Sequence, residues 1–195
     1  MRRTELILLI VLVMLFSAGC QKTDRVEDRD KEIQNGKEET VIPEFSSEYL
    51  IGIDYGGAGW GEYFDCLSAE VIICTDHSVQ IYMPTKVENH SVIDRGLIAT
   101  LSLTDEQYEK IEKSVDREKL FTLDPEPDQS VLDGYSRYLM LYDTDQQLLK
   151  RCGGYMPQSK VFNQMYGAVN ANLPEEIAAI REEQIEKLRE WSNQP

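Results

Sequence analysis

The chain has 195 residues, of which 42% are hydrophobic, and a formal net charge of −15 with only two histidines. This acidic excess excludes a nucleic-acid partner held through phosphate contacts, because such binding needs Lys and Arg to neutralise the backbone. It also excludes adhesion to anionic lipid through basic residues, since the acidic side chains would be repelled.

The chain begins with a segment typical of exported proteins. Arg2 and Arg3 precede an unbroken apolar run over residues 6–16, and small residues follow up to Cys20. A basic start, a short apolar core and small residues at its end are the features of a secretory signal peptide, and the run is too short to span a bilayer as a permanent helix. We expect residues 1–19 to direct export and then to be removed.

The end of this segment resembles the lipobox of bacterial lipoprotein precursors, through Phe16, Ser17, Ala18, Gly19 and Cys20. The resemblance implies cleavage before Cys20, a diacylglyceryl thioether on its sulfur and acylation, for example by palmitate, of the new amino terminus. Two acyl chains hold a protein lastingly, whereas one chain binds only reversibly. We expect attachment to the cell membrane through the lipid on Cys20, facing outside the cytoplasm; an ordinary secreted protein is the alternative.

The segment after the anchor, residues 20–44, has the composition of a disordered tether. Residues 21–44 contain no aromatic side chain and a dense mixture of both charge signs. Such a segment buries too little apolar surface to offset the entropy of ordering it. Removal of residues 1–19 leaves 18 basic and 34 acidic residues, a charge of −16. A short charged helix is the alternative for this segment.

Residues 45–195 have the length and composition of one domain with a single core. The stretch "EYLIGIDY" alternates as a strand, with Tyr49, Ile51, Ile53 and Tyr55 on one face. The stretch over residues 68–84 predicts a hairpin that turns at residues 76–78. We expect apolar residues of its two arms to meet: Val71 and Ile73 with Val79, Ile81 and Met83.

The next segments complete the first half of the domain. Residues 85–96 read as a loop and residues 97–103 as a strand. Thr104 with Gln107 three residues later makes a capping box, so we expect a helix over residues 104–121.

The second half repeats the order of hairpin and helix. Residues 135–155 predict a hairpin with its turn at residues 143–146. Two helices follow, each with an apolar stripe. The stripes comprise Phe162, Met165, Tyr166, Val169 and Leu173, and, after Pro174, Ile177, Ile180, Leu188 and Trp191. We expect an α+β fold, an antiparallel sheet built from hairpins with two or three helices packed on one face.

Several short motifs resemble a family of uncharacterised lipoprotein domains of Gram-positive bacteria. They are "GGAGWGEY", "VLDGYSRYLMLYD", "CGGYMP" and "VFNQMYGAV", within residues 48–173. The resemblance implies the same architecture and carries no activity or catalytic residue.

The glycine-rich stretch at residues 56–61 is our candidate binding surface, with Gly57, Gly59, Trp60 and Tyr63 as its residues. It has neither the Lys-Ser/Thr ending of a P-loop nor the third glycine of a dinucleotide fingerprint. Trp60 either packs against the core or is exposed. An exposed Trp60 would be a stacking platform for a sugar or peptide.

Metal-ligating and catalytic residues are sparse in the sequence. Cys74, Asp76 and His77 lie together, but no second cluster completes a four-ligand site. His77 and His90 are the only histidines, and no G-x-S-x-G elbow is present. We therefore predict no metal, no cofactor and no catalytic residue.

Three cysteines remain beside Cys20, and an extracytoplasmic domain permits a disulfide. We choose Cys66 with Cys152, because Cys74 lies within an apolar strand. A domain without a disulfide is the alternative.

We expect a non-catalytic binding or interaction module for an envelope glycan, peptide or protein. One alternative is a cell-envelope hydrolase that uses loop carboxylates or His77. Another is a structural partner of a further envelope protein.

Overall fold

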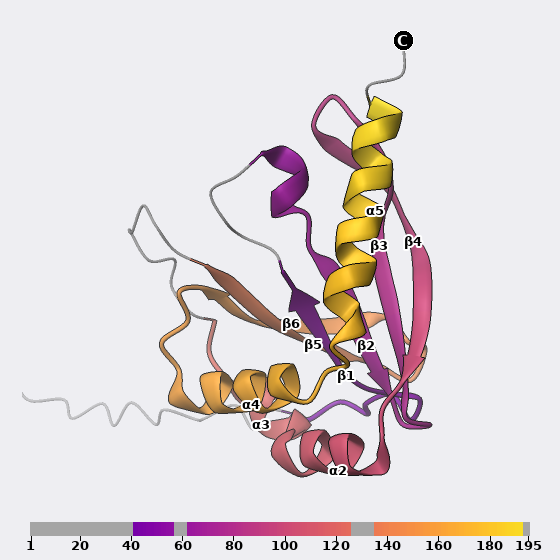
Figure 1. The fold of residues 1–195 in the computed structure, drawn as a ribbon. Coiled ribbons are helices and arrows are strands. Elements are labelled where there is room, and N and C mark those ends of the chain that lie inside the picture. Colours follow the sequence, from indigo (N-terminus) through magenta and orange to yellow (C-terminus); the bar gives the residue numbers. More distant parts are fainter. Residues whose placement is uncertain (1–40, 57–61, 126–134, 193–195) are drawn as a thin grey trace, which may run out of the picture. The chain divides into compact units, whose positions relative to one another are not determined.

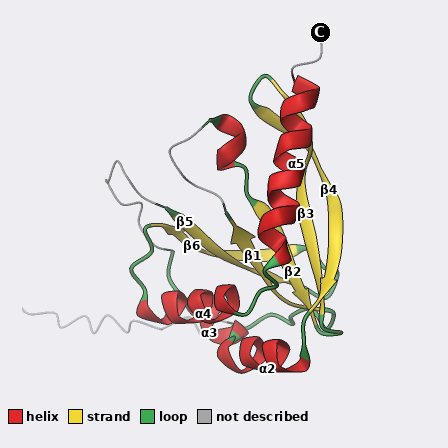
Figure 2. Ribbon diagram, viewed as in Figure 1, coloured by secondary structure: helices red, strands yellow, loops and turns green. Residues whose placement is uncertain are grey.

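The computed structural model describes residues 41–56, 62–125 and 135–192, except the side chains of Asp65 and Cys66. All of these residues belong to the unit formed by residues 40–195. The fold is α+β, as predicted, with a six-stranded antiparallel sheet and four α-helices among the described residues (Figures 1 and 2).

The sheet runs in the order β4-β3-β2-β1-β5-β6, so β4 and β6 are its edges. The strands are β1 (Tyr49–Tyr55), β2 (Ala69–Cys74), β3 (Ser78–Glu88), β4 (Ser91–Ser102), β5 (Ser136–Tyr142) and β6 (Leu148–Tyr155). The helices are the 3₁₀ turn η1 (Tyr63–Cys66), α2 (Asp105–Ser114), α3 (Arg117–Thr122), α4 (Lys160–Ala171) and α5 (Glu176–Ser192).

Alternate residues of the strands form one large apolar core together with helix side chains. In the β2–β3 hairpin, Val71 pairs with Ile81 and Ile73 with Val79, and all four are fully buried. The predicted meeting of these arms is therefore confirmed. The helices contribute Tyr108, Ile111, Leu120, Phe162, Met165, Val169, Ile177 and Ile185 to the same core.

The intervening strand positions form a second, smaller cluster. It comprises Ile72, Cys74, Met140 and Tyr142, with Tyr49 and Tyr82 packed against them. Successive side chains of a strand point to opposite faces, so this cluster lies on the other face of the sheet. We call this surface the tyrosine face: Tyr49, Gly52, Asp54, Glu70, Ile72, Cys74, Gln80, Tyr82, Tyr138, Met140, Tyr142 and Arg151.

Tyr49, the first residue of β1, does not lie on the predicted face of the sheet. Ile51 and Ile53 are buried in the large core, but Tyr49 packs in the second cluster instead. The pairing of β1 with β2 is irregular between Tyr49 and Ile51, and Leu50 joins the core. An extra residue in a strand reverses the direction of the side chains before it.

The predicted loop at residues 85–96 is also wrong, because β3 and β4 continue through it as a long hairpin. Its turn residues, Asn89 and His90, have positive φ angles of 50° and 60°. Two such residues form a turn that matches the twist of the flanking strands, and Asn tolerates this conformation. Lys86 pairs with Asp94 and Val87 with Val92 beyond the predicted strand end.

The single helix predicted over residues 104–121 is two helices. Its capping box is confirmed: the Gln107 amide donates to Thr104 Oγ1 at 3.2 Å and the Thr104 amide to Gln107 Oε1 at 2.9 Å. Asp116 then starts α3, because its carboxylate accepts from the Lys119 amide at 2.9 Å.

The apolar stripe predicted for the last helix holds except at its end. Ile177 and Leu188 are buried in α5, whereas Trp191 is 56% exposed. Trp191 belongs to the last turn of α5, and neither apolar cluster of the described residues includes it. The stripe predicted in α4 is confirmed at Phe162, Met165 and Val169.

Candidate functional site

Most of the predicted binding surface lies outside the described residues. This applies to Gly57, Gly59 and Trp60, and also to the lipidation residue Cys20. Tyr63 is described: it is half-buried in η1, with its ring edge-to-face with Phe64 at 5.5 Å and with His90 at 5.4 Å. Its ring is thus engaged by protein neighbours.

The predicted Cys66–Cys152 disulfide is not formed in the structure, where Cys152 is a free, buried thiol. The Cys152 thiol donates to the Leu120 carbonyl oxygen at 3.3 Å. Cys152 lies on the edge strand β6, and two strands separate β6 from β2, which follows η1. Cys66 belongs to η1, and its side chain lies outside the described residues.

The absence of a metal site stays a prediction. Cys74, Asp76 and His77, the possible metal ligands in the sequence, have different surroundings in the structure. Cys74 is buried, and Asp76 accepts from the Ser78 amide and hydroxyl at 2.9 and 2.6 Å. These bonds lower the pKa of Asp76. Within the described ranges, no group of three His, Cys, Asp or Glu residues could hold a metal ion.

His77 makes a contact with a carboxylate that the sequence did not predict. Its Nδ1 lies 3.2 Å from Asp105 Oδ1, and its ring stacks on Tyr108 at 4.0 Å. Asp105 is almost fully exposed, so water screens this pair. The hydrogen bonds of the described residues give His77 no serine, threonine or cysteine side-chain partner. Within the described ranges, this pair thus has a base and its orienting acid but no nucleophile in hydrogen-bond contact.

The tyrosine face is held together by a contact that crosses β1. The Tyr142 hydroxyl, from β5, donates to Glu70 Oε1 on β2 at 2.8 Å. Its ring passes over Gly52, where an added Cβ would lie 2.7 Å from the hydroxyl oxygen. The absence of a side chain at Gly52 therefore allows Tyr142 to reach Glu70.

A second contact on this face crosses the neighbouring strand β5. Arg151, on β6, forms an ion pair with Asp54 on β1. The Arg151 guanidinium also lies 3.7 Å from the centre of the Tyr138 ring. Asp54 and Tyr138 thus hold Arg151 in one orientation, because a planar guanidinium stacks on aromatic faces while it pairs with a carboxylate.

A shallow hollow of about 300 Å³ lies beside these contacts. Arg95 reaches over it from β4 and donates to the Ser68 carbonyl oxygen at 2.6 Å. Leu148, on β6 and more than half exposed, adds an apolar side chain to its lining. The lining residues are Asp54, Ser68, Glu70, Arg95, Met140, Leu148 and Arg151. The hollow offers both hydrogen-bond donors and acceptors, beside an apolar wall.

Tyr142 and Tyr49 of this face stay protonated at neutral pH. Burial, followed by the charge of Glu70, raises the pKa of Tyr142 far above its ordinary value. Burial also raises the pKa of Tyr49, whose ring meets that of Tyr142 edge-to-face at 5.3 Å. Each hydroxyl is therefore a donor as well as an acceptor, and the packed rings are fixed in place.

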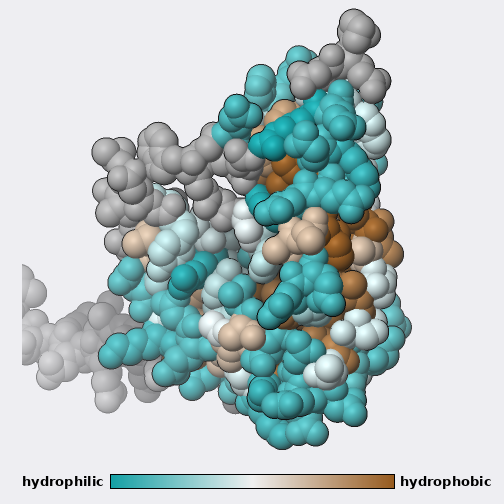
Figure 3. Space-filling model, in the orientation of Figure 1, coloured by the Kyte–Doolittle hydropathy of each residue, from teal (hydrophilic) through white to brown (hydrophobic). Residues whose placement is uncertain are grey.

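The edge strand β4 carries the other exposed apolar residues of the sheet. Val92, Ile93 and Leu97 are 39%, 53% and 51% exposed. In the view of Figure 3, polar residues cover α5, and hydrophobic surface shows beside it over β3 and β4. A long edge strand with exposed apolar side chains is a template for pairing with another chain.

The tyrosine face was not predicted from the sequence, although the alternation of residues along β5 contains a signal for it. Tyr138, Met140 and Tyr142 alternate with Leu139 and Leu141 on β5. A strand with apolar residues on both faces has either both faces covered within the protein or one face available to bind a partner.

Comparisons with protein families, curated proteins and solved structures return no match to this chain. Within the described part of the chain, no helix is sufficiently long and apolar to cross a membrane.

Proposed function

We propose that the mature chain is a non-catalytic binding module, held at the outer surface of the cell membrane by lipid on Cys20. The tyrosine face binds a protein or peptide of the cell envelope. Apolar side chains of the described helices pack into the large core, and none of them belongs to the cluster on the tyrosine face.

The composition of the tyrosine face carries this proposal. Side chains of Tyr49, Tyr82 and Tyr142 pack there from three strands, and the Arg151 guanidinium lies over the ring of Tyr138 on the same face. Tyrosine and arginine are enriched in the residues that contribute most to protein interfaces. Their mutual contacts fix them before a partner arrives, which lowers the entropy cost of binding.

Two exposed leucines provide apolar anchors at the edges of this face. Leu97, on β4, pairs with Tyr82, and Leu148, on β6, pairs with Tyr142. Each is about half exposed in the described structure. A partner that spans the sheet would bury both leucines.

Affinity capture tests the proposal, with the lipidated protein solubilised from native membranes as bait. Leu97→Asp and Leu148→Asp place a charge at each edge of the tyrosine face, and both should lose at least about tenfold of the specifically captured partner. Trp191→Asp is the matched control, since it also places a charge at an exposed apolar position, on α5.

Capture that is equal for wild type, Leu97→Asp and Leu148→Asp would contradict the proposal. Loss of the partner with Trp191→Asp alone would instead support a structural partner that docks on α5. If the wild-type protein captures a glycan, and the substitutions leave the captured proteins unchanged, an envelope glycan is favoured as the ligand.

An envelope hydrolase is the second candidate function, and the contact between His77 and Asp105 is the observation that favours it. Hydrolysis of cell-wall material that His77→Gln abolishes, with folding intact, would establish that activity.

A further inference from the structure

Arg137 differs from the other arginines of the described residues in its contacts. Its guanidinium carbon lies 4.1 Å from the centre of the Tyr135 ring and 5.2 Å from that of the Tyr166 ring. The other described arginines have hydrogen-bond acceptors: Arg95 with Ser68, Arg117 with Ser46, Arg151 with Asp54, Arg181 with Leu67 and Arg189 with Glu186. For Arg137, the described part of the chain provides neither a carboxylate nor a carbonyl oxygen within bonding distance.

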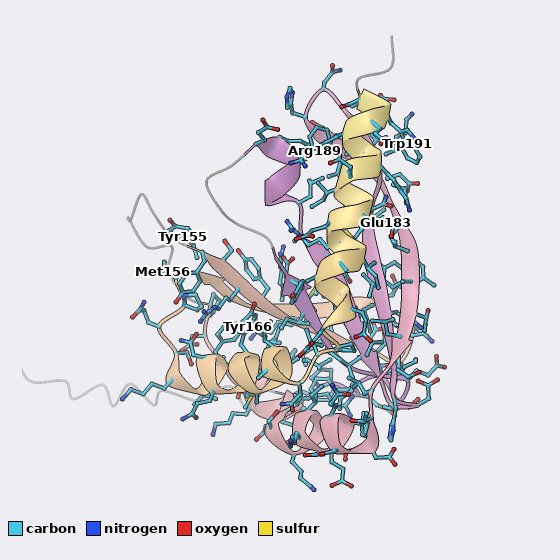
Figure 4. All side chains as sticks on the ribbon, viewed as in Figure 1. Tyr155, Met156, Tyr166, Glu183, Arg189 and Trp191 are labelled. Atoms are coloured by element: carbon cyan, nitrogen blue, oxygen red, sulfur yellow. The ribbon has the colours of Figure 1, made fainter. Side chains whose placement is uncertain are left out.

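The fold brings the three residues together from two elements and a turn. Arg137 lies on β5 opposite Gly154 of β6, where no side chain competes for the space. Tyr135 precedes β5, and its carbonyl oxygen accepts from the Met156 amide at 2.8 Å. Tyr166 stands on the side of α4 that faces these strands (Figure 4).

The two rings hold the guanidinium without neutralising it. Stacking on an aromatic face fixes the plane of an arginine, but it uses none of the five N–H donors. Burial raises the pKa of Tyr166, so this side chain stays an uncharged phenol. Arg137 thus presents N–H donors that no residue of the described ranges takes up, in a mature chain that has 34 acidic residues.

We propose that Arg137, clamped by Tyr135 and Tyr166, binds an oxyanion group of a ligand, either a carboxylate or a phosphate. Such groups present two oxygens to the fork of N–H donors in a guanidinium. The partner site proposed on the tyrosine face does not include these residues, because Arg137 alternates with Tyr138 along β5 and points to the opposite face.

Isothermal titration of the full lipidated protein in non-ionic detergent tests this site. Sodium acetate and sodium phosphate are the probes, at an ionic strength held constant with sodium chloride. We expect saturable binding in the millimolar range for at least one anion, as suits a single charge-assisted contact. Tighter acetate binding indicates a carboxylate ligand, and tighter phosphate binding indicates a phosphoryl group.

Three variants locate the binding. Arg137→Met should abolish it, and Arg137→Lys should weaken it at least fivefold, because an ammonium lacks the fork. Lys119→Met removes one positive charge at an exposed position of α3 and should leave the affinity unchanged. Circular dichroism checks folding, and Arg137→Lys decides the question if Arg137→Met does not fold. The absence of saturable binding by wild type, or equal binding by a folded Arg137 variant, overturns the proposal.

Discussion

At the scale of single residues, Gly52 determines whether the tyrosine face can form. A Cβ at this position would lie 2.7 Å from the Tyr142 hydroxyl oxygen and 3.1 Å from Met140 Cβ. We predict that Gly52→Ala lowers the free energy of unfolding by about 1–3 kcal/mol, because the ring must move away from Glu70. Urea denaturation measures this change.

Gly167→Ala is the matched control for this change, since nothing lies within 4 Å of its added Cβ. Gly167 is exposed within α4, so alanine should raise the free energy of unfolding by up to ~1 kcal/mol. Equal effects of the two substitutions would show that Tyr142 does not lie over Gly52.

Because of Tyr142, we expect the free energy of unfolding to fall as the pH rises into the alkaline range. Its pKa is raised in the folded protein, while in the unfolded chain it is about 10. Only the unfolded state loses this proton as the pH rises above about 10, so the stabilisation present below that pH is progressively lost.

We predict that Tyr142→Phe makes the loss of stability above about pH 10 less steep, and costs about 1 kcal/mol at neutral pH through the lost bond to Glu70. Denaturation at a series of pH values measures both effects. A variant with an unchanged alkaline slope would contradict the assignment of this proton to Tyr142.

The cysteines should be unreactive until the domain unfolds. Burial raises the pKa of both Cys74 and Cys152, which keeps them as thiols. We predict that iodoacetamide modifies neither at pH 8 in the native protein and that both react after denaturation. Mass spectrometry of the unfolded protein without reductant should count Cys66, Cys74 and Cys152 all as thiols, and a single thiol among them would contradict this prediction.

At the scale of elements, the start of α2 is set by two local hydrogen bonds. Thr104→Ala removes the acceptor of the Gln107 amide, and we predict a loss of about 1 kcal/mol in unfolding free energy. Glu109→Gln, which removes only an exposed contact with Lys113, should have little effect. If thermal unfolding shows no difference between these variants, the cap does not stabilise the domain.

The sequence predicted those helix starts and turns that are determined by residues close together in the chain. The capping box at Thr104 and the turn before Ser78 are examples, since both rely on residues within a few positions. The β3–β4 hairpin was missed because its turn, Asn89-His90, has no glycine and the arms carry charged residues. The cap at Asp116 was missed because Asp also occurs within exposed helix faces.

At the scale of the whole molecule, the candidate site could not be predicted because distant strands build it. Glu70 and Tyr142 are 72 residues apart, and Asp54 and Arg151 are 97 residues apart. The first pair meets across β1, which lies between β2 and β5, and the second pair meets across β5, which lies between β1 and β6. Alternation assigns a residue to a face of its strand, but it does not give the order of the strands.

The proposed localisation at the cell membrane depends on one residue, Cys20. We predict that wild-type protein, expressed in a bacterium, incorporates labelled palmitate and sediments with membranes, with Cys20 as its first residue. Cys20→Ser should incorporate no label and leave the membrane fraction. The decisive measurement is the intact mass and fractionation of these two proteins side by side. Membrane retention of Cys20→Ser with unchanged acyl labelling would contradict the lipid anchor, and with it the proposed binding module at the cell envelope.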